Sequence, residues 1–182
     1  MADTWRDHWD RLLALQERIE QHATGRSGTP IEADADFASF LVESENLRDG
    51  VKKECERRSL ASYPVDAQMR SVISLQLAHD LAIKVKHEIQ TREKPWSTAS
   101  DATYRVKVSK SLPEPHSPFG SRGRSTTVPG TLSPPLEPRR WAHEWEIRYT
   151  PHGLSTLIVD GLQFSRGVIA DWRTILTTQA LA

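Results

Sequence analysis

The sequence is poor in several features that mark particular classes of protein. It contains a single cysteine, Cys55, which excludes an internal disulfide framework and any zinc or iron–sulfur site built from several cysteines. Its 24 basic residues balance its 24 acidic residues, which argues against a protein whose main task is to bind nucleic-acid backbone or anionic lipid. No apolar run approaches the roughly 20 residues of a membrane helix, and the first residues lack the apolar core of a signal peptide. We therefore expect a cytoplasmic protein that makes no contact with a membrane.

Four segments show the apolar periodicity of amphipathic helices. Thr4 and Asp7 are placed to form a capping box at the start of the first helix, and Asp160 is a favourable N-cap for the last. Cys55 continues the apolar stripe of the second helix, so we expect a buried structural thiol rather than a nucleophile. The predicted helices cover residues 4–21, 33–57, 65–90 and 160–181.

Between the last two of these helices the composition changes. Residues 111–140 hold seven of the eleven prolines, three of the nine glycines and five serines, which predicts a long mobile loop. Apolar and polar residues alternate before this loop and twice after it, a pattern typical of half-buried strands. We therefore predict a single α+β domain that is predominantly helical. It has a helical bundle (1–95), a small antiparallel sheet (96–110 and 141–159), a Pro-rich loop (111–140) and a C-terminal helix that packs back on the bundle (160–182).

The third predicted helix carries the most informative polar residues. Asp80, Lys84 and His87 recur at helical spacing and therefore share one face. Inside a groove of the bundle, such a row can hold a phosphate or move a proton, which makes these three residues the candidate catalytic set. On a solvated face, the same row is an ordinary arrangement of ion pairs, with His87 as a favourable cation in the last turn.

Four further residues are candidates for binding. His79 and Lys86 form a second pair on the third helix, partly parallel to the first row. The second helix has a short polar break, and if the two helices pack antiparallel, Arg48 or Asp49 faces Asp80.

The same two segments carry a resemblance to a known group of proteins. Residues 45–49 (Glu-Asn-Leu-Arg-Asp) and 79–87 (His-Asp-Leu-Ala-Ile-Lys-Val-Lys-His) resemble motifs of uncharacterised bacterial helical proteins, which are distantly similar to the HEPN-like superfamily. The resemblance covers residues 35–90 in motif and the remainder in element order, ending in a Trp-bearing helix at 168–172. It implies a HEPN-like bundle that dimerises through the motif helices. It also implies a setting in phage defence or toxin–antitoxin systems.

The chain departs from this superfamily at the residues that cleave RNA. Active HEPN ribonucleases resemble one another in an arginine that shortly precedes a histidine, whereas Asp80, Leu81 and Ala82 stand at the corresponding positions before His87. An acidic Asp80 repels the phosphate that an arginine would clamp. The resemblance therefore implies a non-catalytic or degenerate interaction module, with a second copy of itself or another protein as its partner. Two alternatives remain: a ribonuclease or other phosphodiester enzyme with an altered Asp80/Lys84/His87 site, and a small-molecule binder in the groove between the helices.

Other parts of the sequence point to fewer sites. Residues 95–140 hold seven basic and three acidic side chains. They form either an RNA-binding arm that orders on contact or a linker with incidental arginines. His–carboxylate pairs occur singly and no Gly-rich phosphate loop is present, so we expect neither a metal nor another cofactor. The arginines of the candidate arm are Arg122, Arg124, Arg139 and Arg140.

Overall fold

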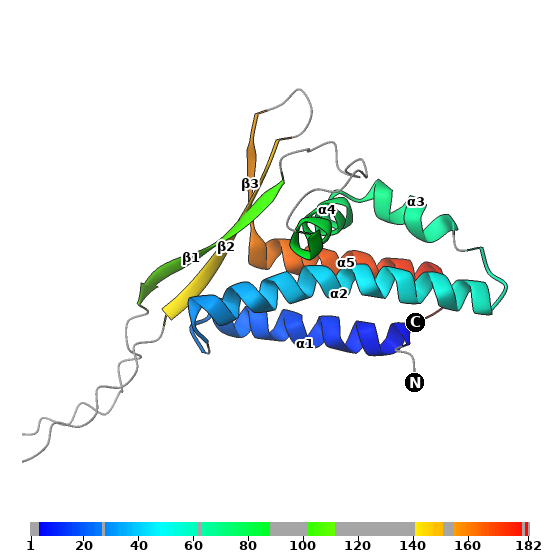
Figure 1. The fold of residues 1–182 in the computed structure, drawn as a ribbon, viewed down its shortest axis with the longest axis horizontal. Helices are drawn as coiled ribbons and strands as arrows, with labels where there is room; N and C mark the ends of the chain where they lie inside the picture. The colour runs from blue at the N-terminus through cyan, green and yellow to red at the C-terminus, as the bar shows by residue number, and fades with distance from the viewer. Residues whose placement is uncertain are drawn as a thin grey trace, which may run out of the picture.

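In the computed structural model, a bundle of helices carries a small sheet at one end (Figure 1). The structure describes residues 4–26, 28–61, 63–87, 102–111, 141–150, 155–179 and 181. The long helices α1 (Trp5–Ala23), α2 (Pro30–Arg57) and α5 (Gly161–Thr178) run along the bundle, and the chain turns back through α3 (Tyr63–Ser71) and α4 (Ile73–His87). α4 contacts both α2 and α5. The strands β1 (Thr103–Ser111), β2 (Trp141–Tyr149) and β3 (Leu157–Asp160) form an antiparallel sheet in that order. The predicted α+β class is confirmed.

Side-chain caps set where the helices begin. The predicted capping box of Thr4 and Asp7 is present, and the Asp160 side chain accepts a hydrogen bond from the backbone of Gln163 at 2.8 Å. The second helix begins at Pro30 rather than near residue 33, because Thr29 and Glu32 form another capping box around a proline in the first turn. This box is readable in the sequence, so the earlier start could have been predicted.

The prediction of one continuous helix over 65–90 is wrong. The chain leaves the helical conformation at Val72, and the side-chain amide of Gln76 donates to the carbonyl of Arg70 at 2.5 Å. That bond satisfies a carbonyl at the end of α3 which would otherwise lack a helical partner. The break lets α3 pack against α2 while α4 crosses both α2 and α5. α4 ends at His87, and residues 88–101 lie outside the described residues.

The sheet confirms the predicted alternation and adds one exception to it. Trp145 and Ile147 of β2 point into the core, and Tyr104 and Val106 of β1 pack against it. Glu146 faces the other side of the sheet, yet it is buried. The reason is that three cations converge on its carboxylate: Arg105, Lys107 and Arg148. Most of the Pro-rich loop, residues 112–140, lies outside the described residues.

The core joins the sheet to the helices around Phe37. Its ring centroid lies 5.1 Å from that of Tyr104 and 5.5 Å from that of Trp145, so one aromatic residue of α2 contacts both long strands. Burial raises the pKa of Tyr104 to about 12. The thiol of Cys55 is buried as predicted, and burial raises its pKa as well. Among the described helices, none combines the length and apolar character needed to cross a membrane.

Two glycines of α5 provide a test of this packing. A Cβ atom on Gly161 would lie 2.3 Å from the Cβ of Trp145, so Gly161→Ala must displace either α5 or β2. We expect the free energy of unfolding to fall by about 1–3 kcal/mol in urea titrations. Gly167→Ala is the matched control, because the nearest atom to its added Cβ is 4.0 Å away in Ser74. It should stabilise the helix by about 0.5–1 kcal/mol. Equal changes in the free energy of unfolding for the two variants would contradict the close contact between Gly161 and Trp145.

Candidate functional site

A buried ion pair joins α2 to α4 at the position of the predicted polar row. His79 Nδ1 donates to Glu45 Oε2 at 2.8 Å, and the two side chains are only 4% and 6% exposed. Asp80 is also 4% exposed. From Leu75 to Ala82 every residue of α4 except Gln76 is buried, because α4 lies against α2 on one side and α5 on another. The interpretation of the row as a solvated face is therefore wrong for Asp80.

Arg48 extends this pair into a chain of charges. Its Nη1 donates to the second carboxylate oxygen of Glu45, and its Nε donates to Asp66 Oδ1 at 2.8 Å. Lys52 Nζ donates to Asp66 Oδ2 at 2.7 Å. These contacts form one continuous ion-pair chain, which ties α4 to α2 and α2 to α3. Its members, in order, are His79, Glu45, Arg48, Asp66 and Lys52. Each carboxylate in the chain lies between two donors.

The charges in the chain stabilise one another against the cost of burial. Burial alone would raise the pKa of Glu45, but the hydrogen bonds and charges of His79 and Arg48 hold it below its ordinary value. Likewise, burial opposes ionisation of Asp66, and the bonds from Arg48 and Lys52 lower its pKa. Desolvation acts against the charge of Arg48 too, and its two carboxylate partners raise its pKa. Glu45, Asp66 and Arg48 are therefore all charged at neutral pH.

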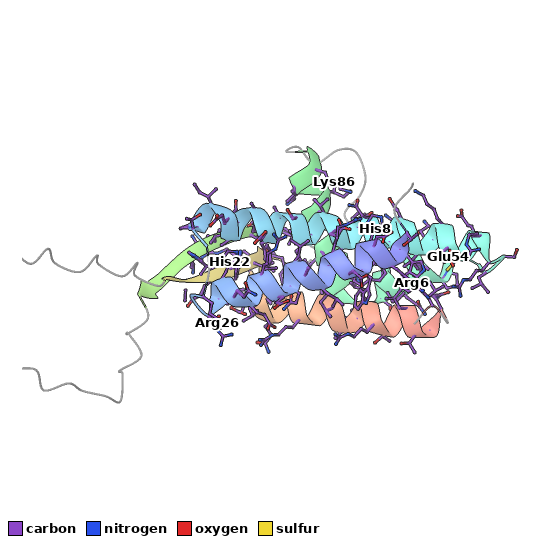
Figure 2. The ribbon with its side chains drawn as sticks, turned by 90° about the horizontal axis from the view of Figure 1, so that it is seen from below. Arg6, His8, His22, Arg26, Glu54 and Lys86 are labelled. Carbon is purple, nitrogen blue, oxygen red and sulfur yellow. The ribbon has the colours of Figure 1, made fainter. Side chains whose placement is uncertain are left out.

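The two lysines of the third predicted helix contact other elements. Lys84 Nζ donates to the backbone carbonyl of Ala102 at 2.5 Å, which ties α4 to the start of β1. Lys86 lies near the end of α4, where that helix projects beyond α2 (Figure 2), and its ammonium donates to Asn46 Oδ1 at 3.2 Å. The two lysines thus contact neighbouring elements in different directions.

Two predicted residues take no part in the described contacts of the site. Asp49 is exposed on α2 and does not face α4, whereas the neighbouring Arg48 does approach the α2–α4 contact through Glu45. His87 is the last residue of α4, and its side chain lies outside the described part of the structure. A catalytic set of Asp80, Lys84 and His87 therefore stays a prediction.

The described residues contain no group of three His, Cys, Asp or Glu side chains that could hold a metal ion. The arginines of the candidate RNA-binding arm belong to residues 112–140, which the structure does not describe, so that arm also stays a prediction.

Sequence reasoning missed three members of the ion-pair chain: Glu45, Lys52 and Asp66. Glu45 and Lys52 share a helical face with Arg48, so a charged row on the buried side of α2 was a readable signal. Asp66 gave no such signal. Its contact with α2 depends on how α3 packs back against α2, which is a tertiary contact.

A second group of ion pairs holds α1 to α2. Glu43 accepts hydrogen bonds from both His8 and Arg11, at 2.6 and 2.9 Å. Nearer the sheet, Asp36 accepts from His22 at 2.9 Å. Two carboxylates of α2 are thus each held by a histidine of α1, and neither histidine faces a nucleophile. These contacts position helices and show no arrangement suited to catalysis.

Comparisons of the chain with protein-family profiles, with curated proteins and with solved structures found no match. Its function is therefore argued from the geometry of its own residues.

The ion-pair chain predicts a large and pH-dependent contribution to stability. Glu45→Gln removes the carboxylate that accepts from both His79 and Arg48, and Arg48 keeps only Asp66, so we expect unfolding in urea at neutral pH to cost about 3 kcal/mol less. Glu20→Gln is the control, because Glu20 and its partner Arg166 are both exposed and should change stability by less than about 1 kcal/mol.

The pKa of Glu45 is lowered by folding, so its contribution is complete above the ordinary pKa of 4.5 and is lost as the pH falls through the lowered value. The stability gap between the wild type and Glu45→Gln should therefore narrow in acid, as measured by urea titrations across that range. A gap that is the same at every pH would contradict an ionised, paired Glu45.

Proposed function

We propose that this chain is a non-catalytic interaction module with a HEPN-like bundle, which self-associates in the cytoplasm. The observation that carries the proposal is the burial of His79 in its pair with Glu45. A general acid or base must reach its substrate, and His79 is closed off from solvent and held by a carboxylate. The phage-defence or toxin–antitoxin setting rests on the resemblance of residues 45–49 and 79–87 to HEPN-like motifs.

The motif residues are poor candidates for the contact between two copies. Glu45, His79 and Asp80 are all buried within one protomer, so they cannot bind a second copy without opening the bundle. An interface elsewhere on the surface fits the structure better than dimerisation through the motif helices.

The edge strand β3 offers such an interface. Leu157 and Ile158 are 45% and 60% exposed, and they are adjacent in sequence. β3 pairs with β2 on one side, and none of the described strands pairs with its other side. Natural edge strands are usually protected by lysine, proline or a bulge, and β3 (Leu-Ile-Val-Asp) contains neither of these residues.

Pairing of β3 with β3 of a second copy would join the two sheets edge to edge. Antiparallel pairing of a strand with itself has twofold symmetry, as most homodimer interfaces do. The exposed aliphatic side chains of both copies would meet at the junction, where burial removes them from water. The other exposed aliphatics of the described surface are isolated and need no partner: Ile31 on α2, Leu60 between α2 and α3, and Ile73 on α4.

The first test of this proposal is the mass of the protein in solution. We expect light scattering coupled to size-exclusion chromatography to give twice the mass of one chain for the wild type and the mass of one chain for Ile158→Glu. Ile73→Glu places the same charge on another exposed isoleucine, 48% accessible at the start of α4, and should remain dimeric. A monomeric wild type, or a dimeric Ile158→Glu, would overturn self-association through β3.

The second test concerns catalysis. Purified protein incubated with total cellular RNA should leave the RNA intact, as should a His87→Ala variant prepared in the same way, and gel electrophoresis provides the measurement. Degradation by the wild type that His87→Ala abolishes would contradict a non-catalytic module and establish the alternative enzyme.

A further inference from the structure

A groove of about 510 Å³ lies between the first turns of α1 and the last turns of α5. This end of the bundle is remote from the sheet (Figure 1). Its volume falls within the range of small-molecule sites, roughly 300–1,000 Å³. The α1–α5 groove is lined by Trp5, Arg6, Trp9, Asp10, Arg173, Leu176, Thr177 and Leu181.

The floor of the groove is apolar and firmly packed. Trp5, Leu176 and Leu181 are 7%, 3% and 3% exposed, so each belongs to the core and presents only one edge to the groove. Trp9 is partly buried and packs against the same core. Residues fixed by the core form a preformed surface, which lowers the entropic cost of binding a ligand.

The rim of the groove carries two arginines, Arg6 and Arg173. Across the described residues, no carboxylate forms an ion pair with Arg6 or Arg173. The guanidinium of Arg6 rests 5.2 Å from the ring centroid of Trp5, at the end of α1 that lies beside α5 (Figure 2). Asp10 is the single acid of the lining, so the groove has an excess of one positive charge. The positive partial charge at the start of α1 and the negative partial charge at the end of α5 oppose each other. The arginines therefore determine the sign of the net charge at the groove.

We propose that the α1–α5 groove binds an amphipathic monocarboxylate, a molecule with an unbranched apolar tail and one carboxylate. The tail would lie along Trp9 and Leu176, where burial of apolar surface favours binding. The carboxylate would pair with Arg173, whose planar guanidinium matches its geometry. One excess positive charge suits a monoanion better than a phosphate dianion. This site does not depend on the proposed self-association, because β3 lies at the other end of the bundle.

The site differs from the small-molecule groove that the sequence suggests between the helices at 33–57 and 65–90. There the ion-pair chain of Glu45, Arg48 and His79 occupies the contact between α2 and α4. In the α1–α5 groove, by contrast, the charged groups are exposed at the rim and available to a ligand.

The test uses three probes with the same tail: decanoate, decanol and decylamine. Titration of the full-length protein, followed by calorimetry and by tryptophan fluorescence, should show saturable binding of one decanoate, with weaker binding of decanol and none of decylamine. Arg173→Gln should weaken decanoate binding about tenfold and leave decanol unaffected, because it removes one charge-assisted contact. Trp9→Ala should weaken binding of both.

Arg166→Gln is the matched control, since Arg166 is an exposed arginine of the same helix whose partner is Glu20, outside the groove. The affinity of the Arg166→Gln variant for decanoate should equal that of the wild type. Equal binding of decanoate and decylamine, or an Arg173→Gln variant that binds as the wild type does, would overturn the proposal. So would a change of oligomeric state in Trp9→Ala, because the groove would then be a contact between copies.

Discussion

The position of α4 depends on one buried ion pair, Glu45 with His79. Two charged groups in a protein interior stabilise it only if their hydrogen bonds are complete, because each has lost its water. Glu45 meets this condition by accepting from both His79 and Arg48. The chain then continues through Asp66 to Lys52, whose side chains are 24% and 27% exposed. The free-energy cost of removing charges from water is thus concentrated at the Glu45 end of the ion-pair chain, and the Lys52 end remains hydrated.

This pair also selects one arrangement of the helices among several apolar ones. The stripes of α2 and α4 are mostly aliphatic, and aliphatic surfaces can slide by a turn at little cost. A slide of one turn would separate Glu45 from His79 and leave a buried carboxylate without one of its two hydrogen-bond donors, at a cost of about 1–3 kcal/mol. The register of α4 in turn places Lys84 against the carbonyl of Ala102, where β1 begins. The sheet is therefore positioned partly through a charge that lies in the helical bundle.

The sequence contains the information for most elements but not for their junctions. Capping residues such as Thr4 and Asp160 mark helix starts locally, and the alternation around Trp145 marks a strand. The break at Val72 has no such mark, because neither glycine nor proline stands there and the bond that caps α3 comes from Gln76. Asp66 reaches Arg48 because α3 folds back against α2, a tertiary contact that no local pattern marks. Two of the five residues of the ion-pair chain, Arg48 and His79, were candidates from the sequence, and their partners were set by tertiary packing.

Equal numbers of acidic and basic residues do not mean that each charge is paired with one opposite charge. Glu45, Asp66, Glu43 and Glu146 each accept from two or more basic side chains, so these four acidic charges are paired inside the fold or at its sheet. The pairing is uneven along the chain, and some arginines form no ion pair with any carboxylate of the described residues. Arg6 and Arg173 are two of them among the described residues, and they lie beside an apolar groove rather than on a flat basic face. A flat basic surface suits a nucleic-acid backbone, whereas two cations at the rim of an apolar groove suit a small molecule with one acidic group.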